Sequence, residues 1–151
     1  MVTHDKNVYL FGGLGNELCE KLIILQPDNE DTIDKYIWKT IKQIGVTPKG
    51  RYGHLSVTNK RDKDIYIMGG ARKFNTLTKI RECLNDIYKY NIDSNEWKEL
   101  ICGGSPIEPR RNHAGCIVGK HLFIHGGINQ QGAFTKDNAI LNLSIKFMQQ
   151  V

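Results

Sequence analysis

The stretch Asp64-Ile65-Tyr66-Ile67-Met68-Gly69-Gly70 decides the fold of this chain, because closely related stretches occur once before it and once after it. Residues 7–13 form the sequence NVYLFGG, and residues 121–127 form HLFIHGG. The three diglycines begin at positions 12, 69 and 126, so successive copies are 57 residues apart in both intervals. An apolar strand that ends in two glycines therefore occurs three times at constant spacing, which indicates a repeat protein.

The segment before the diglycine strand also recurs. Arg51-Tyr52-Gly53-His54 precedes the second copy, and Arg110-Arg111-Asn112-His113 precedes the third copy. In both cases a short strand separates this R-x-x-H motif from the diglycine strand. Each complete repeat is therefore predicted to open with two antiparallel strands.

The segment after the diglycine strand repeats in a similar way. Residues 85–91 alternate apolar and polar side chains, a turn of Asp, Ser and Asn follows, and Trp97 comes next. This pattern predicts two more strands joined by a tight hairpin. In the first copy, residues 22–25 and Trp38 take the same places, whereas the third copy offers residues 138–144 and ends before a clear tryptophan.

Each repeat is thus predicted to hold four short antiparallel strands, a to d in chain order. In the second repeat we expect strand a at about 53–58, b at 64–68, c at 86–91 and d at 96–100. The third repeat supplies a at 113–118, b at 121–125 and c at 139–145, and the first supplies b at 7–11, c at 21–25 and d at 36–41. The array is expected to begin near a strand b and to end near a strand c.

This arrangement resembles the kelch repeat, and the resemblance covers nearly the whole chain. It is carried by three diglycines at constant spacing, a downstream tryptophan in two copies and an R-x-x-H motif in two copies. The resemblance implies an all-β fold, a kelch-type β-propeller of four-stranded antiparallel blades. We expect about three blades, a partial propeller over residues 1–151, with blade one at about 1–43, blade two at about 44–102 and blade three at about 103–151.

The recurring residues are predicted to be structural. Glycine pairs leave room at a strand end for neighbouring backbone or a ring, and tryptophans are expected to fill the gap between blades. The structural motif comprises Gly12, Gly13, Trp38, Gly69, Gly70, Tyr88, Trp97, Gly126 and Gly127. None of the diglycines opens onto a predicted helix, which disfavours a phosphate-binding loop.

The sequence gives one prediction for His54 and His113 and another for His125. His54 and His113 take matching positions in their repeats, which favours structural hydrogen bonds over metal ligation. His125 occupies the place that Phe11 and Met68 hold in the other copies, so a polar ring stands in an apolar layer. Local accommodation and a functional role are both open for His125.

Composition excludes several classes of protein. With 25% charged and 40% hydrophobic residues in 151, the sequence is typical of a globular protein. It shows no signal peptide and no apolar stretch long enough to span a membrane. Cys19, Cys83, Cys102 and Cys116 stand far apart, which favours reduced thiols in the cytoplasm over a disulfide framework or a zinc site. We expect no cofactor and no metal.

The function that we expect is a non-catalytic protein-protein interaction module, a kelch-repeat scaffold or adaptor. Long loops join strand b to c and strand d to the next strand a, and they share one end of the blades. The resemblance implies a binding site for a peptide or protein at that end. The net charge of +5 permits an acidic partner. The predicted partner-binding residues are Arg51, Arg72, Lys73, Arg81, Arg110 and Arg111; the alternative is a loop surface whose charges only keep it solvated.

Three other functions are compatible with the sequence to a smaller extent. The chain could be a fragment of a kelch-fold enzyme, of the oxidase or sugar epimerase type, but no catalytic cluster stands out in the sequence. It could also be the substrate-recognition propeller of a ubiquitin-ligase adaptor. Nucleic acid is disfavoured because the excess positive charge is small and the aromatic residues are explained by packing between blades.

Three blades are fewer than the four to eight that propellers usually have. Both ends of the array should therefore expose an apolar sheet face. Two explanations are open at this point: the chain is a fragment of a longer protein, which we favour, or copies associate through the open blade edges to complete a ring.

Overall fold

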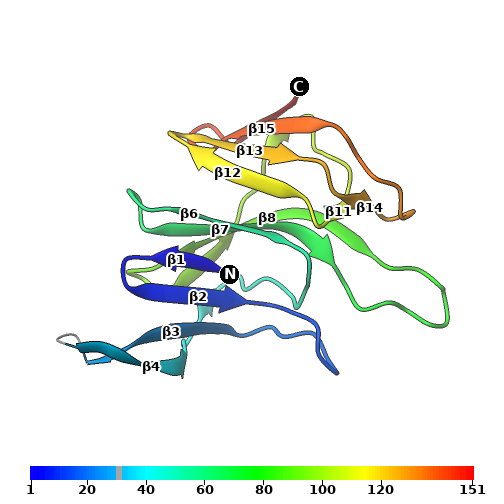
Figure 1. Cartoon of the computed structure of the whole chain (residues 1–151). Helices are drawn as coiled ribbons and strands as arrows, with labels where there is room; N and C mark the ends of the chain where they lie inside the picture. The colour runs from blue at the N-terminus through cyan, green and yellow to red at the C-terminus, as the bar shows by residue number, and fades with distance from the viewer. Residues whose placement is uncertain (30–31) are drawn as a thin grey trace.

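The computed structural model describes residues 1–29 and 32–151, with backbone alone for residues 32–34. It contains sixteen strands, β1 to β16, and no helix among the described residues. Accordingly, the described part of the chain has no helix that could cross a membrane. Most strands belong to three antiparallel sheets, blades one to three, that stack on one another in chain order (Figure 1).

Blade one consists of β1 (Val2–His4), β2 (Asn7–Phe11), β3 (Leu22–Asn29) and β4 (Thr32–Thr40), paired in that order. The expectation that this blade begins near strand b was wrong, because β1 supplies strand a. Its residues pair with β2 in the register Val2 to Tyr9. Asp5 adopts a positive φ of 51°, which closes the tight turn between the two strands.

Blade two consists of β6 (Leu55–Asn59), β7 (Asp64–Ala71), β8 (Cys83–Asn91) and β9 (Glu96–Glu99). These are the four predicted strands, with β7 and β8 extended by several residues toward the loop that joins them. The short strand β5 (Ile44–Gly45) adds to the outer edge and runs parallel to β9.

Blade three consists of β12 (Ala114–Val118), β13 (His121–His125), β15 (Asn138–Asn142) and β16 (Phe147–Gln150), with β10 (Gly103–Gly104) parallel to β16. The expectation that the array ends near strand c was wrong here, because β16 is a complete fourth strand. β16 lacks the tryptophan that indicated the fourth strand in the other two repeats. Separately, β11 (Arg110–Arg111) pairs with β14 (Ile128–Asn129) beside the blade.

Two apolar clusters hold the three blades together. The first lies between blades one and two and includes Tyr9, Phe11, Ile65, Tyr90 and Trp97. The second lies between blades two and three and includes Leu55, Met68, Ile87, Leu122, Ile124 and Met148. Because side chains alternate along a strand, the two faces of blade two each supply one cluster, which explains why its strands are apolar on both sides.

The fourth antiparallel strand of each blade places one large side chain in the same register. Trp38 lies opposite Leu25, Trp97 opposite Tyr90, and Met148 opposite Leu141. Trp97 is fully buried against blade one, as predicted, and Met148 is buried against blade two. Trp38 is 57% exposed, contrary to prediction, because its side of blade one faces away from the other two blades.

The diglycines bring neighbouring blades into close contact. Gly12 has a φ of +71°, and a Cβ atom there would lie 2.5 Å from the Arg51 carbonyl oxygen and 3.0 Å from the His54 ring. Gly69 repeats this arrangement against the backbone of Arg110 and the ring of His113. In blades one and two, the first glycine of the pair thus admits the R-x-x-H motif of the following blade, which requires the absence of a side chain.

Candidate functional site

The loops that join the second strand to the third in each blade lie at one end of the molecule, on the right in Figure 1. They comprise residues 12–21, 72–82 and 126–137. The connections between blades, which carry both R-x-x-H motifs, reach the same end. We call this surface the loop end. All six residues that the sequence predicted as partner-binding lie on these loops and connections.

Arg51 is not available to a partner, because it is only 1% exposed and fully engaged. Its guanidinium forms a bidentate ion pair with Asp86, in which Nη2 donates to Oδ2 at 2.9 Å. It also donates to the backbone oxygens of Lys49 and Gly69. A planar cation with five donors suits this combination of carboxylate and carbonyl acceptors. Arg51 therefore fixes the connection between blades one and two.

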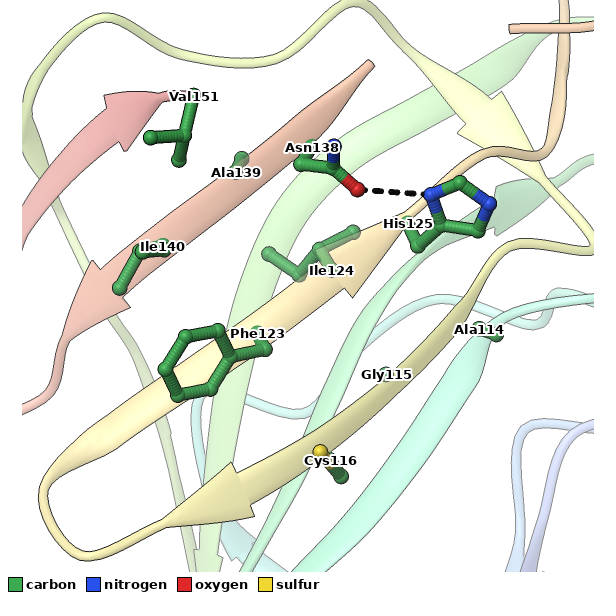
Figure 2. Close-up of a pocket in the computed structure, with 10 residues that line it drawn as sticks. All are labelled: Ala114, Gly115, Cys116, Phe123, Ile124, His125, Asn138, Ala139, Ile140 and Val151. Carbon is green, nitrogen blue, oxygen red and sulfur yellow. Dashed lines mark hydrogen bonds between the residues drawn. The ribbon is translucent and has the colours of Figure 1, made fainter. Parts of the chain in front are cut away.

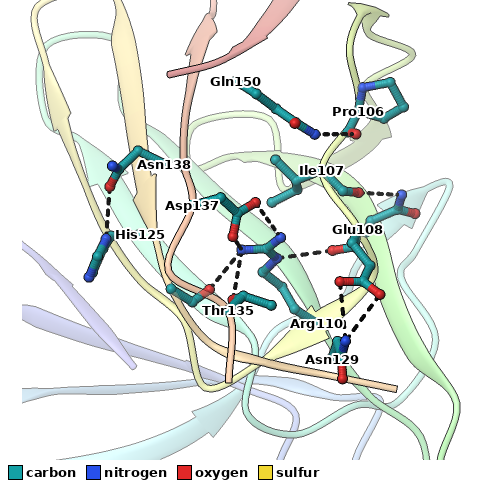
Figure 3. A network of polar contacts seen from close by, with 12 residues as sticks. Pro106, Ile107, Glu108, Arg110, His125, Asn129, Thr135, Asp137, Asn138 and Gln150 are labelled. Carbon is teal, nitrogen blue, oxygen red and sulfur yellow. Dashed lines mark hydrogen bonds and ion pairs between the residues drawn. The ribbon is translucent and has the colours of Figure 1, made fainter. Parts of the chain in front are cut away.

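Arg110 repeats this arrangement in blade three, where it is 2% exposed (Figure 3). Its two terminal nitrogens donate to the carboxylate of Asp137 at 2.8 and 2.7 Å. Further bonds reach the hydroxyl of Thr135 and the backbone oxygens of Gly126 and Glu108. The hydrogen bond from Arg110 lowers the pKa of Asp137 below its ordinary value. The role predicted for Arg51 and Arg110 as a basic rim is therefore corrected: both are internal clamps.

Lys73 and Arg72 lie where the loops of blades one and two meet. The ammonium group of Lys73 donates to the backbone oxygen of Asn16 at 2.7 Å and to Glu17 Oε1 at 2.9 Å. Arg72 donates to the backbone oxygen of Gly50 at 3.2 Å. The side chain of Lys73 remains 51% exposed, so its ion pair is one that a partner can exchange at small cost.

Arg81 and Arg111 complete the predicted set. Arg81 lies over the ring of Phe74, with 5.5 Å between the guanidinium carbon and the ring centroid. Arg111 donates to the backbone oxygen of Asn129 at 3.3 Å and contacts the sulfur of Cys83 at 3.6 Å. Both side chains are half-buried and keep part of the guanidinium at the surface.

Three large apolar side chains at the tips of the loops were not included in the sequence prediction, which relied on charge. Leu14, Leu77 and Phe134 belong to different blades and are 51%, 91% and 81% exposed. Each of the three loops thus presents at least one apolar side chain to solvent, and in the loop of blade two Phe74 and Ile80 are also exposed, at 41% and 49%. The available signal was the presence of large apolar residues in loops that are otherwise polar, and apolar loop tips on a rigid scaffold are typical of protein-binding surfaces.

A hollow of about 540 Å³ lies between the loops of blades one and two. Arg72 and Lys73 line it together with three carboxylates, those of Glu17, Glu20 and Glu82. Glu20 is engaged by the backbone amide of Gly50 at 3.0 Å. The loop end is therefore of mixed charge at this point and is not a continuous basic rim.

The histidines of the R-x-x-H motifs lie between blades, where His113 is buried and His54 is half-buried. Burial is the main cause that lowers the pKa of His54 to about 3 and that of His113 to about 4. Both rings are consequently neutral at pH 7 and serve as packing groups. Over residues 1–29 and 32–151, no three His, Cys, Asp or Glu residues are grouped closely enough to hold a metal ion.

Comparison with known proteins identifies the family. Residues 1–151 match the family model described as the KLHDC2/KLHL20/DRC7 Kelch-repeats domain. The chain belongs to the kelch-repeat family. The kelch resemblance of the sequence is thereby confirmed, and so is the fold class, a kelch-type β-propeller of which this chain forms three four-stranded blades.

Two curated relatives and one solved structure illustrate the likeness. The chain is 28% identical over 142 residues to "Acyl-CoA-binding domain-containing protein 4" of Arabidopsis thaliana, covering 92% of this chain and 19% of that protein. It is also 28% identical over 128 residues to "Rab9 effector protein with kelch motifs" of Xenopus laevis, covering 83% of this chain and 32% of that protein. The solved "Structure of YjhT" matches with a TM-score of 0.72 and 17% identity, over 99% of this chain and 48% of that chain. The kelch chain thus spans a third or less of these two curated relatives.

Proposed function

We propose that this kelch domain is a non-catalytic interaction module that binds a peptide or protein at its loop end. The observation that carries the proposal is the exposure of Leu14, Leu77 and Phe134, one from each blade, in the loops that form the loop end. A partner can bury apolar surface against these side chains, and because they lie on a rigid frame, few groups lose conformational freedom on binding.

The charged residues of the loop end define the kind of partner. Lys73, Arg81 and Arg111 keep part of their charge at the surface, and the three glutamates lie together in the hollow between blades one and two. The partner that fits is a segment with apolar side chains for the loop tips and carboxylates for the cations. The name of the Xenopus laevis relative, an effector of Rab9, supports a protein as the class of partner.

Arg51 and Arg110 contribute to this function indirectly. Each buried guanidinium holds the base of a loop through an ion pair with a partly exposed carboxylate and through bonds to the backbone, so the loop tips keep a defined spacing. They are positioning residues in the proposal, and Arg72, Lys73, Arg81 and Arg111 stay as the predicted contact residues. The four free cysteines support a reducing compartment, and we propose that the domain acts in the cytoplasm.

Selection from a phage-displayed library of random peptides, with the whole chain immobilised as the target, tests the proposal. We expect the selected peptides to carry apolar and acidic residues, and to bind Arg72→Glu/Arg81→Glu at least tenfold more weakly than the parent chain. The Leu77→Asp/Phe134→Asp variant should lose binding to a similar degree, because it removes two of the three apolar tips.

The matched control reverses two cations at the opposite end, Lys60→Glu/Arg61→Glu, in the turn between β6 and β7. It changes the net charge by the same amount and should leave binding unchanged. If the control weakens binding as much as the loop-end variant, attraction depends on overall charge and the proposed site is wrong.

A further inference from the structure

The outer face of blade one has the composition of a covered face, but none of the described residues of another blade packs on it. Side chains that point away from blade two are Val8, Leu10, Ile23, Leu25, Tyr36 and Trp38. Their counterparts by register in blade two include Ile65, Ile67, Tyr88, Tyr90 and Trp97, all of which are buried against blade one. Blade one therefore carries the apolar surface that its neighbour uses to join the preceding blade.

Blade two packs on a face of blade one, and the outer face of blade three carries the residues that correspond to that face of blade one. Phe123 and His125 hold the register positions of Tyr9 and Phe11, the residues of blade one that receive Trp97. They line an open hollow of about 570 Å³ with Cys116 and Ile140 (Figure 2). His125 Nδ1 lies 2.7 Å from Asn138 Oδ1, so the polar ring has a partner within the sheet and presents its flat side to the hollow.

We propose that two copies of this chain associate head to tail, with blade one of each copy packed on blade three of the other. Trp38 of one copy then lies against Phe123 and His125 of the second, as Trp97 lies against Phe11 with 5.4 Å between ring centroids. The contact forms twice, so the pair closes into a six-bladed ring with no apolar face left open. This assembly is independent of the proposed function of the loop end.

The size of the contact supports a stable pair. A blade face of four strands by five residues covers about 19 by 17 Å, or roughly 300 Å². Two contacts remove four such faces from water, roughly 1,200 Å² in total, which reaches the range of specific protein interfaces. The curvature is also suitable, since the three blades superpose on 48% of a longer solved chain.

The blade register also predicts which innermost side chains meet across the new contact. Val57 of blade two and Ile117 of blade three belong to the same apolar cluster. Cys116 has the register of Val57, and Thr3 has the register of Ile117. Both side chains are exposed in the single chain. Thr3 of one copy is therefore expected beside Cys116 of the other.

Light scattering after size-exclusion chromatography tests the assembly directly. We expect a discrete particle of twice 17.2 kDa, and we expect Trp38→Glu to reduce it to the single chain. The control Ile101→Glu alters a side chain that is 78% exposed and lies on neither outer face, so it should leave the pair intact. A single chain at micromolar concentration, or an open series of larger particles, would overturn the proposal.

A cross-link provides a second, independent test. Mild oxidation of Thr3→Cys should join two copies through Cys116, and the joined species should disappear on reduction or when Cys116 is replaced by Ser. The unaltered chain, which lacks the second thiol at this contact, should stay unlinked under the same conditions. Absence of the linked species in Thr3→Cys, with Cys116 reactive to a small thiol reagent, would also contradict the head-to-tail arrangement.

Discussion

Replacement of Trp97 by Ala should strongly destabilise the domain, because this side chain joins blades one and two. Trp97 is fully buried, and its ring lies 5.4 Å from Phe11 and 5.0 Å from Tyr90, centroid to centroid. Its indole nitrogen donates to Gln43 Oε1 at 2.7 Å, which ties the connection between the two blades to β9. Removal of a buried aromatic of this size costs about 3–5 kcal/mol in free energy of unfolding.

Urea unfolding followed by far-ultraviolet circular dichroism measures this loss, since fluorescence would change with the tryptophan itself. The matched control is Leu77→Ala, a side chain that is 91% exposed, for which we expect a change within about 0.5 kcal/mol. A Trp97→Ala variant that unfolds at the urea concentration of the parent would refute the argument that this ring seals the first pair of blades.

Three further predictions concern the connections between blades. Asp86→Ala leaves a buried guanidinium unpaired and should lower the free energy of unfolding by about 3–5 kcal/mol, as judged by urea titration. His54 and His113 have folded pKa values of about 3 and about 4, below the usual unfolded value of about 6.5, so the unfolded chain takes up protons first. Stability is therefore complete above about pH 6.5 and should decline as the pH falls toward 4, and a urea midpoint that is equal at pH 7 and pH 5 would argue against this. Gly69→Ala places a methyl group 2.9 Å from two backbone oxygens at a φ of +60°, whereas Gly119→Ala, at +59°, meets nothing within 4 Å. Both substitutions carry the left-handed penalty of about 1–2 kcal/mol, and calorimetry should show a larger loss at Gly69 alone.

The fold could be predicted from the sequence because the same strand pattern occurs in three copies, each of which indicates one blade. The diglycine strands align β2, β7 and β13, and the turn residues between them place most of the other strands within a few residues. Of the four-stranded blades, the two strands that the sequence missed lie where the markers were absent, and the two-residue strands β5, β10, β11 and β14 were not predicted either. β1 has no R-x-x-H motif before it, and β16 carries Met148 in place of a tryptophan.

The candidate site was predicted less well, because charge in a sequence does not reveal its partner in space. Arg51 and Arg110 looked like surface cations, but Asp86 and Asp137 lie 35 and 27 residues further along the chain and reach them only after the blade has folded. The recurrence of an aspartate just before or at the start of strand c in both blades was the available signal. The expected burial of Trp38 was also wrong, because this side chain lies on the end face of the array, where no described blade packs on it.

The apolar loop tips required coordinates for a similar reason. Leu77 and Phe134 stand in loops of eleven and twelve residues, where periodicity gives no indication of burial. Their exposure follows from the position of each loop beyond the end of its strands, which the structure provides.

The most direct test of the central claim is hydrogen exchange, measured by mass spectrometry, on the whole chain with and without a saturating selected peptide. Binding at the loop end predicts slower exchange in residues 72–82 and 126–137, together with unchanged exchange in the turns at the opposite end, such as residues 60–63. Protection at those opposite turns, with none in the loops, would contradict the account.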